Sequence, residues 1–233
     1  MDNTNAYKHK NFYDAYAIDL SKIYYSKIIE DAEQLFASPA KMLDIGCYDG
    51  TLGEVFLKKG WSVHGIEAHG QACLEAGRKG LDVLKRNIEE GLPYPENTFD
   101  LVVAAEIIEH LYDTDEFLEN IKRILKPQGV LILTVPNVAC LANRVGLLLG
   151  KYPRLCEYQA GKAGGHIRVY TKKALMDQLC QHDFQPLKCR GANLPCPMGL
   201  NFIPKFVKKM AVRLGDFTPS IAGQIIVASR NLK

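Results

Sequence analysis

Two acidic residues and a histidine stand close together at Glu106, Glu109 and His110, and this spacing could support chemistry. They follow an almost unbroken apolar run, FDLVVAA, which is typical of a strand buried on both faces. If a helix begins here, its i, i+3 and i+4 positions put the three side chains on one face. Oxygen and nitrogen ligands of this kind suit Mg²⁺, Mn²⁺ or Zn²⁺. With His166 from a glycine-rich stretch as a further ligand, we predict a divalent-cation site formed by Glu106, Glu109, His110 and His166.

The two histidines also support chemistry that needs no metal. An imidazole titrates near pH 6.5, so His110 or His166 could act as the general base that removes a proton from a substrate hydroxyl. A bound cation would instead lower the pKa of that hydroxyl. A third alternative is that His110 only lines a pocket. The sequence leaves the three alternatives open.

A strand, a glycine-rich turn and a helix precede this site, beginning with the stretch KMLDIGCYDG at Lys41–Gly50. The apolar residues before Gly46 predict a buried strand, and a helical pattern begins at Thr51. Between them, the backbone N–H groups of the glycine loop can point at a polar or anionic cofactor. The spacing of Gly46 and Gly50 differs from the G-x-G-x-x-G fingerprint of dinucleotide-binding proteins, which disfavours a nicotinamide cofactor.

An acidic residue at the end of the next predicted strand supports a cofactor that contains a nucleoside. This strand covers Ser62–Ile66, and Glu67 follows it, 21 positions after Gly46. In nucleotide-binding α/β units, an acidic residue about 20 positions beyond the glycine loop accepts hydrogen bonds from the ribose hydroxyls. We therefore assign Glu67 to the ribose.

With Asp44 in front of the loop, the run D-I-G-C-Y-D-G resembles the first motif of class I S-adenosylmethionine-dependent methyltransferases. The resemblance implies that Asp44 holds the methionine end of the cofactor, with the loop Gly46–Gly50 beneath it. It also implies that Asn87 contacts the adenine, although that family often has an acid at this position and Asn87 could equally cap a strand. The other residues that we assign to the cofactor pocket are Gly46, Cys47, Gly50, Glu67, Ala68, Ile88 and Ala105.

The run E-x-x-E-H at Glu106–His110 resembles that of ubiquinone-biosynthesis O-methyltransferases and of small-RNA 2′-O-methyltransferases, in which it can bind metal. The similarity to the first group extends to a basic insertion and to a histidine near His166. The resemblance implies S-adenosylmethionine as the cofactor and a divalent cation beside it. A Glu-His pair at this place also occurs in the wider superfamily without a metal, where the histidine caps or lines the pocket.

Seven predicted strands alternate with helices, which indicates a doubly wound sheet. By resemblance, we expect a mostly parallel seven-stranded sheet in the order 3-2-1-4-5-7-6, with helices on both faces and one antiparallel strand. After the first two strands, the predicted strands are Asp82–Arg86, Phe99–Glu106, Gly129–Val135, Leu187–Arg190 and Gln224–Ser229. The predicted helices are Asn11–Phe36, Thr51–Lys59, Gln71–Lys79, Asp113–Leu125, Cys140–Leu149 and Thr171–Cys180.

The composition predicts a single cytoplasmic domain over residues 1–233. The chain is 47% hydrophobic and 24% charged, which suits one α/β core. Its 7 cysteines include no C-x-x-C pair, which argues against a disulfide framework and a cysteine zinc site. From the sequence we expect neither a signal peptide nor a membrane-spanning segment.

Charge is distributed unevenly along the chain. Residues 1–138 carry 14 Lys and Arg against 22 Asp and Glu, whereas residues 139–233 carry 15 against 4. The basic part contains two insertions, at about 138–170 and 191–222, which we expect to form the substrate side. Within the second, Leu200–Leu214 predicts an amphipathic basic helix that covers the substrate and contacts a lipid surface peripherally. Simple packing on the domain is the alternative.

These observations favour an S-adenosylmethionine-dependent methyltransferase that modifies an oxygen atom of a small molecule or a lipid-linked metabolite. A second possibility is an RNA methyltransferase, which the basic part would permit. A third is a cofactor-binding regulator that has the fold without catalysis.

Overall fold

The computed structural model describes residues 20, 22–154, 156, 165–193 and 213–233. Within them, one seven-stranded sheet has the order β3-β2-β1-β4-β5-β7-β6. Neighbouring strands are parallel, except that β7 runs antiparallel to both β5 and β6. The predicted doubly wound sheet is confirmed, with its strand order and its antiparallel strand. The strands are β1 (Lys41–Ile45), β2 (Ser62–Glu67), β3 (Asp82–Lys85), β4 (Phe99–Ala105), β5 (Leu125–Pro136), β6 (Phe184–Ala192) and β7 (Gln224–Asn231).

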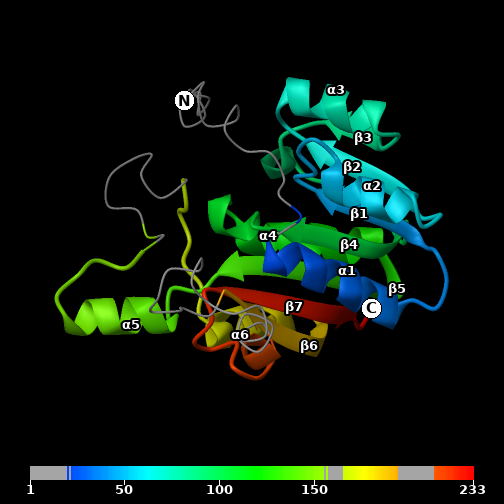
Figure 1. Ribbon diagram of the computed structural model, residues 1–233. Coiled ribbons are helices and arrows are strands. Elements are labelled where there is room, and N and C mark those ends of the chain that lie inside the picture. The colour runs from blue at the N-terminus through cyan, green and yellow to red at the C-terminus, as the bar shows by residue number, and fades with distance from the viewer. Residues whose placement is uncertain (1–19, 21, 155, 157–164, 194–212) are drawn as a thin grey trace.

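Helices cover both faces of the sheet, while α5 stands apart from the two layers (Figure 1). Buried side chains of α1, α2 and α3 share one hydrophobic cluster with the strands, and those of α4 and α6 share the other. The helices are α1 (Ile23–Leu35), α2 (Thr51–Leu57), α3 (Gly70–Arg78), α4 (Thr114–Ile124), α5 (Leu141–Leu148) and α6 (Lys172–Gln181).

Strand β1 shows why a short apolar run becomes the centre of this sheet. Alternate side chains of a strand point to opposite faces. Accordingly, Met42 packs with the α1–α3 cluster and Leu43 with the α4–α6 cluster. Ile45 pairs with Ile66 of β2 and with Ala104 of β4, so these three parallel strands end at one edge. Open α/β sheets bind their ligands at this carboxyl edge.

Several local predictions are wrong. The chain after β4 does not begin a helix at Glu106: only a 3₁₀ helix forms, at Ile108–His110, and Glu106 adopts a left-handed φ of 56°. Its backbone N–H remains bound to the carbonyl of Thr134 in β5 at 3.1 Å, so the sheet pairing continues where the helix was expected. Strand β5 also begins earlier than predicted, because Leu125 pairs with Phe99 before the register shifts.

Several predicted segments lie outside the described residues. These are residues 11–19 and 21 of the predicted N-terminal helix and most of the basic amphipathic insertion, at residues 200–212. Where the structure describes the predicted N-terminal helix, it begins only at Ile23, because Lys22 has an extended backbone. Cys196 is also outside, and the six cysteines that the structure describes are free. Among the described helices, none is long and apolar enough to cross a membrane.

A buried ionic network joins α1 to β6 and to the helical turn at residues 213–217. The ammonium of Lys27, whose side chain is 1% exposed, donates to Asp216 Oδ1 at 2.6 Å and to the Gly191 carbonyl at 2.7 Å. Arg190 donates to both oxygens of Asp216, at 2.7 and 3.1 Å, and to Asp31 at 2.9 Å. Breaking such a buried network is costly, because the remaining charges lose their partners. The network therefore fixes α1 over the sheet.

His182, at the end of α6, lies between two carboxylates of α4. Its Nδ1 is 2.8 Å from Glu119 Oε1, and its Nε2 is 2.9 Å from Asp115 Oδ1. Burial opposes the protonation of the ring, but the hydrogen bonds to Glu119 and Asp115 outweigh it and raise the pKa of His182. Since both ring nitrogens face acceptors, both contacts can be hydrogen bonds only when the imidazole is protonated.

We predict that His182→Gln lowers stability mainly at low pH. A histidine whose pKa is raised by folding stabilises the protein fully below its unfolded pKa of about 6.5, and this contribution is lost as the pH rises through the folded pKa. The free energies of unfolding of wild type and variant, measured with urea, should differ by about 1 kcal/mol near pH 5.5. The difference is no larger because solvent screens the two exposed carboxylates. The difference should shrink by about pH 9. An equal difference at both pH values would contradict the prediction.

Candidate functional site

The turn between β1 and α2 forms a narrow cradle that requires its glycines. Gly46 and Gly50 have φ values of 70° and 74°, which favour glycine. A Cβ on Gly46 would lie 2.3 Å from Ile107 Cδ1, and one on Gly50 would lie 2.8 Å from Ala76 Cβ. The turn thus lies close to both the chain after β4 and helix α3, with no room for larger side chains.

Glu67 ends β2 beside this turn, where its carboxylate joins two loops. One oxygen accepts a hydrogen bond from Tyr48 N at 3.0 Å, and the other accepts one from His69 N at 2.8 Å. The residue is 8% exposed. An ionised carboxylate has about four lone-pair sites, so Glu67 can still accept hydrogen bonds from a ligand. Its position is compatible with the predicted contact to a ribose.

Asp44, near the end of β1, carries a buried oxygen that lacks a hydrogen-bond partner. The residue is 3% exposed, and its Oδ2 accepts no hydrogen bond. Burial, together with the charge of Glu67, raises the pKa of Asp44 to about 8. A buried polar atom without a partner is uncommon and costly. Asp44 is therefore suited to a ligand that brings a hydrogen-bond donor or a positive charge.

The other residues predicted for the cofactor pocket lie around the same edge with different exposures. Asn87 is exposed, and its side-chain oxygen accepts from Glu89 N at 3.1 Å, so it caps the 3₁₀ helix Ile88–Glu90. The capping alternative is thus present in the structure, and the adenine contact stays a prediction. Cys47 is buried, Ile88 and Ala105 are partly buried, and Ala68 is exposed.

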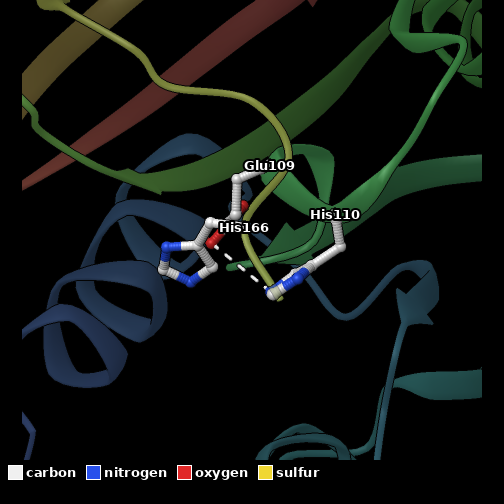
Figure 2. Close-up of side chains that lie close together, drawn as sticks. All are labelled: Glu109, His110 and His166. Atoms are coloured by element: carbon white, nitrogen blue, oxygen red, sulfur yellow. Dashed lines mark ion pairs between the residues drawn. The ribbon is translucent and has the colours of Figure 1, made fainter. Parts of the chain in front are cut away.

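Three of the four predicted metal ligands come together after β4, where their side chains face one another (Figure 2). One potential ligand atom from each of Glu109, His110 and His166 lies within 4.8 Å of the others. Glu109 Oε1 is 4.0 Å from His110 Nε2, and the centroids of the two imidazole rings are 4.8 Å apart. This is the only such group among the described residues.

Glu109 is an unusual carboxylate because it is buried without hydrogen bonds. It is 1% exposed, and neither of its carboxylate oxygens has a hydrogen-bond partner. Burial, with a contribution from the charge of Glu106, raises the pKa of Glu109 well above its usual value. The group can therefore hold a proton, or it can become ionised when a cation arrives.

Backbone contacts hold His166 beside this carboxylate. The carbonyl oxygen of Glu109 accepts hydrogen bonds from Ile167 N at 2.9 Å and from Arg168 N at 3.0 Å. His110 Nδ1 lies 3.2 Å from the carbonyl oxygen of Gly165. Because a carbonyl can only accept, this contact requires the hydrogen on Nδ1. In the neutral ring, Nε2 then carries the lone pair that can bind a cation or accept a proton.

Glu106, the fourth predicted ligand, lies outside this group. Its carboxylate accepts hydrogen bonds from Thr134 Oγ1 at 2.8 Å and from Gln224 Nε2 at 3.1 Å. The left-handed backbone at Glu106 breaks the helical spacing from which we had expected one shared face. The predicted common face of Glu106, Glu109 and His110 is therefore wrong.

Two tyrosines at the start of α1 were missed by the sequence analysis. Tyr24 and Tyr25 are buried, with ring centroids 4.4 Å apart. Burial raises the pKa of Tyr25 to about 12, and the negative charges of Asp44 and Glu106 add to the shift. Both phenols are therefore neutral and close to the buried carboxylates. The predicted helix contained them, but helical spacing alone could not separate them from ordinary core residues.

Comparison with known proteins places these features in context. Residues 10–188 match the family described as "Methyltransferase domain". Ubiquinone biosynthesis O-methyltransferase of Rhodopseudomonas palustris is 36% identical over 101 residues, which are 42% of this chain and 40% of that protein. The human mitochondrial protein of the same name is 35% identical over 120 residues, covering 48% of this chain and 32% of that protein. The similarity thus spans less than half the length of these relatives.

Solved structures share the fold at low sequence identity. A SAM-dependent methyltransferase from Thermotoga maritima has a TM-score of 0.63 at 18% identity, with 89% of each chain covered. One from Archaeoglobus fulgidus has a TM-score of 0.60 at 15% identity, covering 89% of this chain and 93% of that one. At such identities the likeness shows the fold alone.

We predict that Gly46→Ala lowers the free energy of unfolding by about 2 kcal/mol or more, because it adds backbone strain and a collision with Ile107. A matched control is Gly77→Ala in α3, where a Cβ meets nothing within 4 Å. This change should raise the free energy of unfolding by about 0.5–1 kcal/mol. Urea unfolding measures both. Equal effects of the two substitutions would show that the turn does not require glycine.

Proposed function

The chain belongs to the family of methyltransferase domains, and on this premise we propose that it methylates an oxygen atom of a small-molecule or lipid-linked metabolite. The observation that carries this proposal is the buried carboxylate of Glu109, which has no hydrogen-bond partner and lies beside His110 and His166. A hydroxyl must lose its proton when it is methylated, and this group offers both a proton acceptor and potential cation ligands.

The cradle fits S-adenosylmethionine, which supplies an activated methyl group. We assign Asp44, with its unpartnered Oδ2, to the positively charged methionine end, and Glu67 to the ribose. The glycine turn lies beside Glu67, whose carboxylate accepts a hydrogen bond from Tyr48 N of the turn. Asn87, Ile88, Ala68 and Ala105 are further proposed contacts. The role of these residues is to hold and orient the cofactor, since collinear alignment of the reacting atoms supplies much of the rate enhancement in such a transfer.

The donor set around Glu109 also fits a divalent cation. One buried carboxylate and two imidazoles match the ligand preferences of Zn²⁺ and Mn²⁺, and Mg²⁺ would need additional oxygen ligands. A cation would supply Lewis acidity toward the acceptor hydroxyl. We propose Glu109, His110 and His166 as its ligands, with Glu106 held nearby by Thr134 and Gln224.

Without a cation, the same residues provide a base. His110 can take a proton at Nε2, because the Gly165 carbonyl holds the other hydrogen on Nδ1. The Glu109 carboxylate, 4.0 Å from Nε2, would stabilise the resulting imidazolium. His166 is the second candidate base.

The acceptor class can be tested with radiolabelled S-adenosylmethionine and fractionated metabolite, lipid and RNA extracts. Label that appears in metabolites or lipids, in a product that NMR identifies as a methyl ether or a methyl ester, supports the proposal. Label in RNA would favour the alternative that the basic residues 139–233 suggest. Cofactor binding with no labelled fraction would favour a regulator.

We predict that binding of the reaction product S-adenosylhomocysteine strengthens as the pH rises toward about 8 and then levels off. Asp44 has a pKa of about 8 without ligand, and it must lose its proton to pair with the ligand's ammonium. Calorimetry in buffers of different ionisation enthalpy should detect proton release below about pH 8. Asp44→Asn should weaken binding and remove this pH dependence. Unchanged pH dependence in the variant would exclude Asp44.

We also predict that Mn²⁺ or Zn²⁺ binds the protein and that His166→Gln weakens this binding at least tenfold, because one imidazole ligand is lost. His64→Gln is the control, since His64 lies on β2 and contacts Asp82. Calorimetry with the metal alone measures the effect. If wild type does not bind either cation, His110 and His166 remain as candidate bases.

A further inference from the structure

We propose that helix α5 and the segment that follows it form a docking surface for an anionic lipid bilayer. Leu148 is 87% exposed and Leu149 is 67% exposed, values that are unusual for neighbouring leucines. Soluble proteins rarely expose large contiguous apolar patches unless these serve an interaction. The other exposed apolar residues of this stretch are Leu141, Val145, Leu147 and Tyr152.

The exposed leucines belong to an anchored element. Asn143, on the buried side of α5, donates to the Val138 carbonyl at 2.9 Å and to the Arg154 carbonyl at 3.2 Å. Its side-chain oxygen accepts from Arg154 N at 2.8 Å. At the start of the helix, Leu141 N donates to the Ile221 carbonyl at 2.9 Å. These contacts fasten both ends of the segment, so the apolar side is held outward.

Charge complementarity identifies the bilayer as the occupant. Lys151 and Arg154 are exposed in the stretch that directly follows the leucines, and the sequence from Ala139 to Arg154 contains no acidic residue. An amphipathic helix with cationic flanks binds at the headgroup level of anionic membranes. In Figure 1, α5 stands out from the body of the molecule, as an element that inserts into a surface must. This surface differs from the insertion 200–214, and it does not depend on which atom is methylated.

The test is flotation of the full chain with vesicles of an equimolar mixture of phosphatidylcholine and phosphatidylglycerol at low salt. Wild type should float with these vesicles and much less with pure phosphatidylcholine. The pair Leu148→Ser and Leu149→Ser should reduce the partition coefficient at least tenfold, because two inserted side chains are lost. Lys151→Gln with Arg154→Gln should reduce the partition coefficient about fivefold for each charge removed. Added salt should also reduce it, because salt screens the attraction to the anionic lipids.

Leu74→Ser is the matched control, since Leu74 is an exposed leucine of α3, at 59%, outside the docking surface. It should leave flotation unchanged, and circular dichroism should confirm that every variant folds. Failure of wild type to float, or equal flotation of the Leu148 and Leu149 variant, would overturn the proposal. A wild-type dimer that this variant converts to a monomer would also overturn it, because the surface would then join two copies of the chain.

Discussion

The burial of acidic side chains is the constraint on which the carboxyl edge of this sheet depends. Asp44 and Glu109 lie buried there and Glu106 is partly buried, and burial raises the pKa of each. The three carboxylates differ in the hydrogen bonds that they receive. Glu106 receives hydrogen bonds from Thr134 and Gln224, whereas Asp44 and Glu109 retain oxygens without hydrogen-bond partners. Such a site favours ligands that carry donors or positive charge, because they relieve a cost already present in the folded protein.

The fold could be predicted from sequence because its central strands are short apolar runs that end in glycine or acid. The apolar run before Gly46 and the position of Glu67 depend only on neighbours in the chain and on a fixed spacing. The antiparallel position of β7 needed the family resemblance, since periodicity says nothing about strand order. The predicted strand boundaries were wrong where contacts between distant residues determine them. Leu125 is an example, because its pairing with Phe99 extends β5.

The site was predictable only in part for the same reason. His166 was expected beside His110, and the structure brings the two together. The contacts that do so are backbone bonds from Ile167 and Arg168 to the Glu109 carbonyl, which leave no trace in the pattern of side chains. The orientation of Glu106 likewise depends on Gln224, a residue 118 positions away. The ionic network of Lys27, which holds α1 over the sheet, was not foreseen at all.

The place of β7 between β5 and β6 also governs the order in which the molecule can be completed during synthesis. Strand β5 is made first and β6 later, yet neither pairs with the other, and each must wait for β7. Until then, the wholly buried stretch Leu131–Val135 of β5, which is apolar apart from Thr134, presents an unpaired edge. Such an edge invites association with other chains. Because Gln224 at the start of β7 also orients Glu106, the same late step completes both the sheet and its polar edge. Until β7 has been synthesised, the nascent chain is therefore most prone to associate with other chains, and the carboxyl edge of its sheet is incomplete.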